Sequence, residues 1–159
     1  MTERASRLYA ILLYGRDVVC VLEDNRQADG QWRSFAIDVN GRRAAGEARE
    51  IPVGYAPRVA IHPPYIFFWG SATVWWSSLD ESRSGGAQTF SEDVLAVYRL
   101  RDSWVVVTEL GVAVLDGAFE RQVRHFSIGE VIVDHKWTGD VLSVEDLEGK
   151  IIAFDLSSI

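Results

Sequence analysis

The feature that most constrains this fold is a short apolar segment that ends in aspartate and recurs along the whole chain. It occupies residues 34–38, 75–80, 112–116 and 151–155. The four closing aspartates, Asp38, Asp80, Asp116 and Asp155, are separated by 42, 36 and 39 residues. A nearly fixed spacing of this size predicts one supersecondary unit repeated four times. Neighbouring units are expected to pack together, because a single unit of this kind cannot bury its apolar face alone.

Two further apolar segments precede each of these aspartate-ending segments. In the third unit, for example, residues 94–98 and 104–107 come before 112–116, and Arg, Asp, Ser and Gly residues separate them. Short runs rich in valine and aromatic residues, divided by turn-forming residues, predict β-strands. We therefore expect an all-β chain built of antiparallel meanders.

Some of the predicted strands are apolar without interruption. Residues 18–22, 66–69 and 105–107 show no alternation of apolar and polar side chains, whereas a strand with one face in water does alternate. We expect these strands to be covered on both faces. The segments that follow the first three aspartates are rich in Arg, Ser, Gly and Glu, and they predict a polar outer strand in each of the first three units.

In its period and in its number of strands per unit, the chain resembles β-propeller repeats. The resemblance is to the repeat class, because the chain has no Gly-His…Trp-Asp signature and no diglycine strand motif. It implies one all-β domain over residues 1–159, with units at about 1–50, 51–91, 92–127 and 128–159 in a four-unit propeller-like arrangement. A large β-meander sandwich or barrel is the alternative.

The fourth unit ends before a polar outer strand. We expect residues 2–7 to supply that edge and so to close the ring. An open arc of four units that dimerises is the competing arrangement, and the sequence is compatible with a monomer or a homodimer.

The charge and cysteine content narrow the classes of partner. The net charge is −7 and the isoelectric point is near 4.9, which argues against binding of a nucleic-acid backbone. No apolar run approaches the about 18 residues of a membrane-spanning helix. Cys20 is the only cysteine, so an internal disulfide is impossible and we expect a cytoplasmic protein.

Residues that could support catalysis do not form a recognisable set. His62, His125 and His135 are far apart in the sequence, and none has a second ligand at metal-binding spacing. Asp134 precedes His135 directly, but neighbours on a strand point to opposite faces. We expect each repeat aspartate to cap a turn through its own backbone. The chain has no nucleophile elbow, phosphate loop or dinucleotide fingerprint, so we predict no catalytic residue, no metal and no cofactor.

We therefore expect a non-catalytic protein-binding module, for example an inhibitor or immunity-type protein for a basic partner. The candidate contacts are Glu23, Asp24 and Asp29 in the long polar segment 23–30, together with Trp75 and Trp76, one of which we expect at a face or rim. The alternative function is a hydrolase whose site is assembled from carboxylates and histidines of several repeats.

Overall fold

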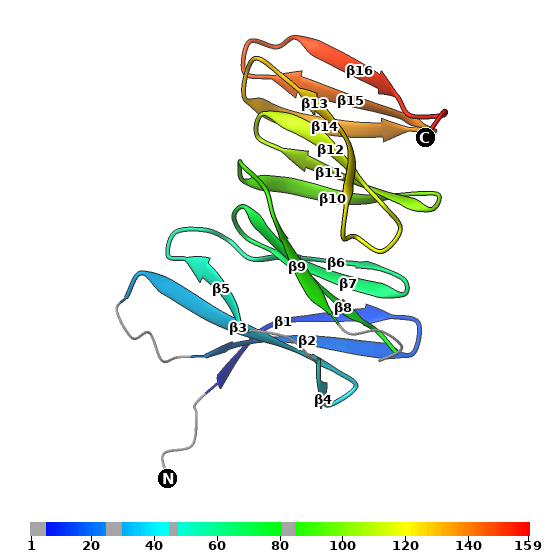
Figure 1. The fold of residues 1–159 in the computed structure, drawn as a ribbon. Coiled ribbons are helices and arrows are strands. Elements are labelled where there is room, and N and C mark those ends of the chain that lie inside the picture. Colours follow the sequence, from blue (N-terminus) through cyan, green and yellow to red (C-terminus); the bar gives the residue numbers. More distant parts are fainter. Residues whose placement is uncertain (1–5, 25–29, 45–47, 81–84) are drawn as a thin grey trace. The chain divides into compact units, whose positions relative to one another are not determined.

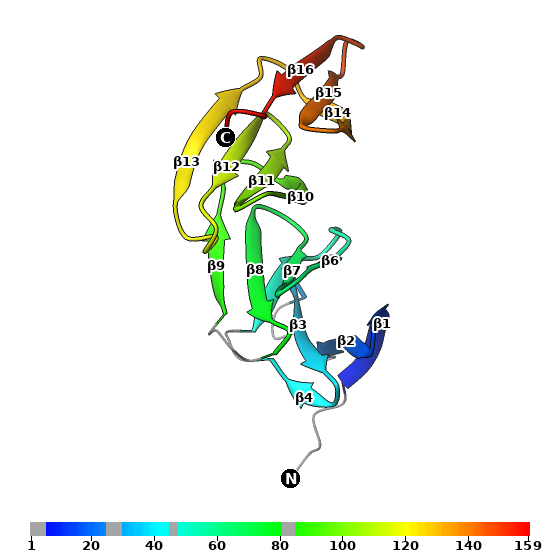
Figure 2. The ribbon, with the colours of Figure 1, turned by 90° about the vertical axis from the view of Figure 1, so that its right-hand side faces the viewer.

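A computed structural model shows an all-β chain (Figures 1 and 2). The structure describes residues 6–24, 30–44, 48–80 and 85–159. Within these ranges it has sixteen strands: β1 (Ser6–Tyr14), β2 (Asp17–Asp24), β3 (Trp32–Val39), β4 (Arg42–Arg43), β5 (Arg49–Pro52), β6 (Arg58–His62), β7 (Tyr65–Trp69), β8 (Thr73–Ser78), β9 (Gly86–Thr89), β10 (Val94–Leu100), β11 (Ser103–Thr108), β12 (Gly111–Leu115), β13 (Gln122–Ser127), β14 (Ile132–Thr138), β15 (Val141–Asp146) and β16 (Ile151–Asp155).

The strands form four antiparallel sheets in chain order. The first sheet has the order β1-β2-β3-β4, and β5 also pairs with β3. The others are β6 to β9, β10 to β13, and the three-stranded sheet β14 to β16. Consecutive strands are neighbours throughout, as short turns allow in antiparallel pairs. The predictions of an all-β chain and of antiparallel meanders are therefore confirmed.

The internal contacts divide the chain into two compact units, residues 1–89 and 90–159. The first unit contains the sheets β1–β5 and β6–β9, and the second contains β10–β13 and β14–β16. Within each unit a hydrophobic core joins the two sheets. In the first unit the rings of Phe35 in β3 and Phe68 in β7 are 5.4 Å apart. In the second, the rings of Phe126 in β13 and Phe154 in β16 are 5.1 Å apart.

A single extra residue recurs in the first strand of three sheets. The register shifts between Leu8 and Ala10 in β1, between Val94 and Ala96 in β10, and between Ile132 and Asp134 in β14. A β-bulge of this kind changes the face on which the following side chains lie. The repetition of the bulge supports the repeat that the aspartate spacing predicts.

Burial on both faces is confirmed for two of the three uninterrupted apolar segments. Every residue of β7 and of β12 is buried, as are residues 104–108 of β11. The prediction is wrong for residues 18–22. In β2, Val19 and Val21 are fully buried, but Val18 is 39% exposed and Cys20 and Leu22 are half-buried. Only one face of this sheet packs in the core. An uninterrupted apolar segment therefore does not by itself show that both faces of the strand are covered.

The outer strands are polar, as expected. The residues of β4 are exposed, and in β13 all except Phe126 are exposed. The proposed edge strand of the fourth unit, residues 2–7, mostly lies outside the described residues. Ser6 and Arg7 belong to β1, where they pair with Asp24 and Glu23 of β2.

Two of the four repeat aspartates cap turns as predicted. The Asp116 carboxylate accepts hydrogen bonds from the backbone N–H groups of Glu120 (2.9 Å) and Arg121 (3.2 Å). These donors hold the pKa of Asp116 below its ordinary value. Asp155 accepts one from the N–H of Ser157 at 3.0 Å. Asp38 instead forms an ion pair with Arg43 at 2.6 Å, since β4 turns back beside it.

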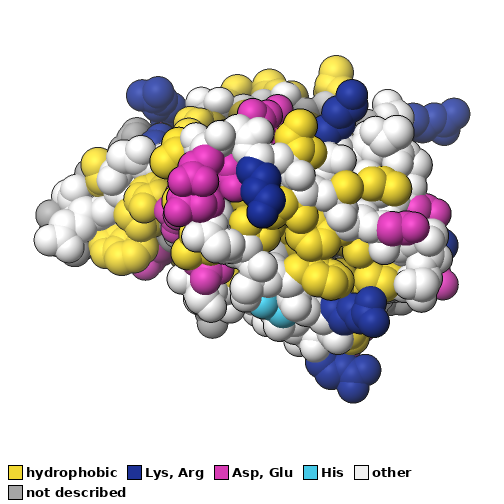
Figure 3. Space-filling view, turned by 90° about the horizontal axis from the view of Figure 1, so that it is seen from above, with side chains coloured by type: hydrophobic (Ala, Val, Ile, Leu, Met, Phe, Trp, Pro, Cys, Tyr) yellow, Lys and Arg dark blue, Asp and Glu magenta, His cyan; other side chains and the backbone are white. Residues whose placement is uncertain are grey.

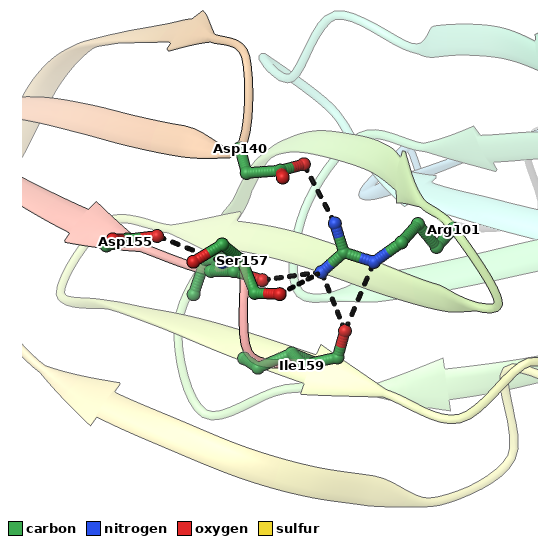
Figure 4. A network of polar contacts seen from close by, with 6 residues as sticks. Arg101, Asp140, Asp155, Ser157 and Ile159 are labelled. Atoms are coloured by element: carbon green, nitrogen blue, oxygen red, sulfur yellow. Dashed lines mark hydrogen bonds and ion pairs between the residues drawn. The ribbon is translucent and has the colours of Figure 1, made fainter.

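Arg101 in the β10–β11 turn fixes the end of the second unit (Figure 4). Its Nη1 donates to Asp140 Oδ1 at 2.9 Å, and its Nη2 donates to the carbonyl oxygens of Leu156 and Ile159, both at 2.7 Å. Nη2 also reaches the Ser157 carbonyl at 3.2 Å. The planar guanidinium can serve several acceptors at once because its donors form a rigid fork. Arg101 therefore ties the β14–β15 turn to the residues after β16.

Arg49 in β5 is a buried cation in the first unit. The residue is 3% exposed, and its Nη2 donates to Ser77 Oγ at 2.6 Å. Its Nε has no hydrogen-bond partner. Burial lowers the pKa of Arg49 to about 10, and the nearby positive charge of Arg43 lowers it further in the same direction. Among the described residues, no carboxylate compensates this charge.

We predict that Arg101→Ala lowers the free energy of unfolding by about 1–3 kcal/mol, because several charge-assisted hydrogen bonds are lost at a partly exposed site. Arg101→Lys should restore little of this, since an ammonium cannot reproduce the fork. Arg124→Ala, at an exposed position of β13, is the matched control and should stay within about 0.5 kcal/mol of wild type. Chemical denaturation measures all three, and equal midpoints for Arg101→Ala and Arg124→Ala would contradict the role of Arg101.

We predict the opposite sign for Arg49→Met, because methionine fills a similar volume without a buried charge. The free energy of unfolding should rise by about 1–3 kcal/mol at neutral pH. A cation whose folded-state pKa is depressed disfavours the folded state at all pH values below about 10, and the penalty is relieved above that value. The gain in stability of Arg49→Met over wild type should therefore shrink above about pH 10. Arg16→Met, in an exposed turn, is the control. A loss of stability in Arg49→Met would refute the assignment of Arg49 as a destabilising buried cation.

Candidate protein-binding surface

The acidic charge of this protein belongs to the second unit. Residues 1–89 contain ten acidic and ten basic residues and carry no net charge. Residues 90–159 contain thirteen acidic and six basic residues, so the whole net charge of −7 lies there. The negative charge that would attract a basic partner therefore lies on the second unit.

Acidic side chains gather on the outer face of the sheet β14–β16. Asp134 in β14 lies directly opposite Glu145 in β15, and both point away from the core side on which Leu142 and Val144 are buried. Like charges directly opposite each other destabilise a sheet. Lys136 shares this face and offsets part of the repulsion. Glu130 precedes β14, and Glu148 lies in the β15–β16 turn; both are exposed.

Exposed apolar side chains surround the same end of this sheet. Val133, Leu147 and Ile151 are 54%, 68% and 67% exposed. Ile151 pairs with Glu145, and the backbone N–H of Leu147 donates to the carbonyl of Val131 at 2.8 Å. Figure 3, seen from above, shows hydrophobic and acidic side chains next to one another on this side of the molecule. We name the set the acidic patch: Glu130, Val131, Val133, Asp134, Glu145, Leu147, Glu148 and Ile151.

A buried aspartate holds the turn that carries part of this patch. Asp146 is 4% exposed, and its Oδ1 accepts hydrogen bonds from the backbone N–H groups of Glu148 (3.0 Å) and Lys150 (2.9 Å). A carboxylate that accepts backbone donors inside a turn fixes the turn conformation. Leu147 and Glu148 are therefore presented in a defined geometry. Lys150 contributes one positive charge at the edge of the patch.

The acidic residues predicted from the sequence occupy a different setting. Glu23 and Asp24 belong to β2 and not to a loop, and Asp29 lies outside the described residues. Glu23 is 9% exposed and accepts two hydrogen bonds from Arg33, Nε to Oε1 at 2.9 Å and Nη2 to Oε2 at 3.1 Å. The Arg33 hydrogen bond holds the pKa of Glu23 below its ordinary value of 4.5. The charge of Glu23 is thus already neutralised inside the sheet.

The two adjacent tryptophans of β8 are both largely covered. Trp76 is 8% exposed, and its indole lies over Gly86 of β9, where an added Cβ would approach within 2.3 Å. Trp75 points to the other face, is half-buried, and packs with its ring 5.9 Å from that of Phe68. Both indoles therefore serve packing in the first unit.

A cavity of about 300 Å³ lies in the first unit. It is lined by Ser6, Leu22, Asp24, Ser34, Phe35, Ala36, Arg43, Ala44, Ala48 and Arg49. Glycoside hydrolysis ordinarily needs two carboxyl groups about 5–10 Å apart. Among the described residues this lining has one carboxylate, Asp24, together with Arg43 and Arg49.

The histidines form no shared centre. The Nδ1 of His135 is 2.5 Å from the hydroxyl of Tyr98, whereas the Asp134 carboxylate accepts from the backbone N–H of His135 at 2.8 Å. Burial raises the pKa of Tyr98, and the nearby Asp134 charge raises it further. Across the described ranges, no three His, Cys, Asp or Glu side chains are placed to hold a metal ion. No helix in the described part of the chain has the length and apolar character needed to cross a membrane.

The sequence carries one signal of the acidic patch. Six acidic residues fall between positions 130 and 148, with Lys136 as the single basic residue in that range. The net charge of the whole chain does not reveal this concentration of acidic residues near its end. The second signal, the pairing of Asp134 with Glu145, depends on the strand register and was not available from the sequence.

We predict that Glu23→Gln lowers the free energy of unfolding by about 1–3 kcal/mol at pH 7, because Arg33 loses its buried partner. The pKa of Glu23 is depressed in the folded state, so this stability is present above the unfolded value and is lost as the pH falls through the folded one. The difference from wild type should therefore narrow below about pH 4.5. Glu50→Gln, at an exposed position of β5, is the control. A Glu23→Gln protein of unchanged stability would favour a contact role instead.

No protein-family model matches the sequence, and no curated protein matches it. Solved structures do. The computationally designed protein Ika8 matches with a TM-score of 0.61 at 11% identity, over 93% of this chain and 45% of Ika8. The designed protein Ika4 gives 0.59 at 10% identity, over 96% and 92%. Hsv2 of Kluyveromyces lactis, a β-propeller protein, gives 0.57 at 15% identity, over 96% and 49%.

The chain thus spans about half the length of Ika8 and of Hsv2. At these identities the likeness concerns the fold alone. Together with the four antiparallel sheets, it supports an all-β, propeller-like fold.

Proposed function

We propose that this chain is a non-catalytic protein-binding module and that its acidic patch contacts a basic partner. The partner surface would carry lysine or arginine beside apolar side chains. In this proposal the four sheets are four successive units of a propeller-like arrangement, and the patch lies on the last unit. An inhibitor or immunity-type protein that acts on a basic target would have this character.

The observation that carries the proposal is the cross-strand pair of Asp134 and Glu145. Two carboxylates in this position repel each other in the free protein. A cationic side chain placed between them would relieve that repulsion and gain two charge-assisted contacts. The arrangement is therefore unfavourable for the sheet by itself and favourable for binding a cation-bearing partner.

The exposed apolar residues of the patch give the contact its second component. Charge complementarity acts mainly on the association rate, and salt screens it beyond about 8 Å. Apolar anchors that become buried on binding mainly set the lifetime of a complex. Val133, Leu147 and Ile151 are exposed beside the carboxylates, so the patch offers both components within one surface.

The charges of residues 1–89 sum to zero, and in this unit Glu23 is paired with Arg33 and Asp38 with Arg43. For this reason we place the proposed contact on the sheet β14–β16 and not on the segment 23–30.

The test compares two variants of equal net charge as baits for proteins from a cell extract. The patch variant carries Asp134→Asn, Glu145→Gln and Glu148→Gln, and the control carries Asp102→Asn, Glu109→Gln and Glu120→Gln. Each triple change reduces the net charge from −7 to −4. We predict that a basic partner held by wild type and by the control is lost from the patch variant. Its association rate with the patch variant should be lower by about tenfold at low salt.

The same variants report on the sheet without any partner. Removing the repulsion between Asp134 and Glu145 should raise the free energy of unfolding by about 0.2–1 kcal/mol. A partner that the patch variant retains, or that both variants lose equally, would refute the proposed surface. Loss of binding together with loss of folding is distinguished by this stability measurement.

A further inference from the structure

The cavity of about 300 Å³ in the first unit has an acidic end that the strand register defines. Ser6, Asp24 and Ser34 lie opposite one another on β1, β2 and β3. Side chains directly opposite each other lie on the same face of a sheet, and all three residues line the cavity. This end of the cavity therefore combines one carboxylate with two hydroxyl groups.

An apolar floor separates this end from a basic one. Leu22 and Ala36, the next opposed pair on the same face of β2 and β3, both line the cavity. Two residues further along β3, Asp38 lies opposite Arg43 of β4, which also lines it. A strand rises about 3.3 Å per residue, so Ser34 and Asp38 are about 13 Å apart along β3. A carboxylate and a guanidinium thus lie at opposite ends of the floor.

The Arg43 side chain can accept a further negative group. Its Nε donates to Asp38 Oδ1 at 2.6 Å, and the side chain is 61% exposed. A guanidinium has five N–H donors in a fixed fork, so one ion pair leaves donors for a second acceptor. A ligand carboxylate is an acceptor of the matching planar geometry.

Arg49 adds a second positive charge near this end. It lies opposite Phe35, and its Nη2 donates to Ser77 Oγ of β8 at 2.6 Å, so its side chain is directed to the core side of the sheet. Arg49 therefore acts on a ligand through its charge. Besides burial, the positive charge of Arg43 lowers the pKa of Arg49, which shows that the two cations repel each other. A negative group bound at Arg43 would offset this repulsion.

We propose that this cavity binds a small zwitterion of the amino-acid type, with its ammonium group at Asp24 and its carboxylate at Arg43. The charged side chains at the site are Asp24, Asp38, Arg43 and Arg49, and together they carry no net charge. A ligand without net charge therefore matches the site better than an anion or a cation. Methylene groups between its charged ends would cover the apolar floor. The volume is at the lower limit of small-molecule sites, and the acidic patch takes no part in this site.

Isothermal titration calorimetry tests the proposal with zwitterions of two lengths, γ-aminobutyrate and ε-aminocaproate. Each is compared with the acid and the amine of the same chain length, which keep only one of its charges. Each charged end should contribute about tenfold in affinity, as a charge-assisted hydrogen bond does. Wild type should therefore prefer a zwitterion to both analogues.

Two variants assign the ends of the ligand. Asp24→Asn should bind the zwitterion and the acid about equally, because the ammonium group has lost its partner. Arg43→Gln should bind the zwitterion and the amine about equally. Arg42→Gln is the matched control, because Arg42 is the neighbouring residue of β4 and does not line the cavity. It should keep the preference of wild type.

Arg49→Met separates binding from folding. It should lower the affinity for the zwitterion several-fold, since a nearby positive charge is lost, while the stability rises as predicted above. In NMR spectra the methyl signals of Leu22 and Ala36 should shift with the probe, and those of Leu142 and Val144 in the second unit should not. Equal affinities of wild type for zwitterion, acid and amine would overturn the proposal, and this comparison needs no variant. A preference that either Asp24→Asn or Arg43→Gln retains would overturn it as well.

Discussion

Packing of sheets face to face is the interaction on which the rest of this structure depends. A strand whose two faces are both covered can be apolar throughout, and β7 and β12 are buried along their whole length. A strand covered on one face only must present its other face to something else. For β2 that face is apolar, and for β15 it is polar and acidic. The chemistry of each uncovered face therefore decides which partner it can accept.

Much of the fold follows from local sequence signals. The spacing of the aspartates, the valine-rich segments and the polar stretches after them predict the strands and the meander order, because strand propensity and turn chemistry act over few residues. The covering of a strand is a non-local property. Residues 18–22 are as apolar as 105–107, yet Val18 is exposed whereas Val105 is fully buried. The composition of a segment indicates that its side chains favour burial. It does not indicate whether another part of the same chain covers them.

The candidate site was less accessible from the sequence for two physical reasons. Glu23 looked like a free acidic residue, but strand pairing with β3 brings Arg33 against it, and ten positions of separation give no hint of that contact. Asp134 lies opposite Glu145 only because one extra residue enters β14 after Ile132. Without this bulge the alternation along the strand would turn Asp134 toward the core. A one-residue irregularity thus determines whether the acidic patch exists.

The two uncovered faces differ in chemistry, so contacts through them should differ in how strongly they depend on salt concentration. Apolar contact depends little on ionic strength, whereas attraction between exposed charges is screened beyond a Debye length of about 8 Å at physiological salt. A partner of the acidic face of β15 should therefore bind more weakly as salt rises, whereas a partner of the apolar face of β2 should not.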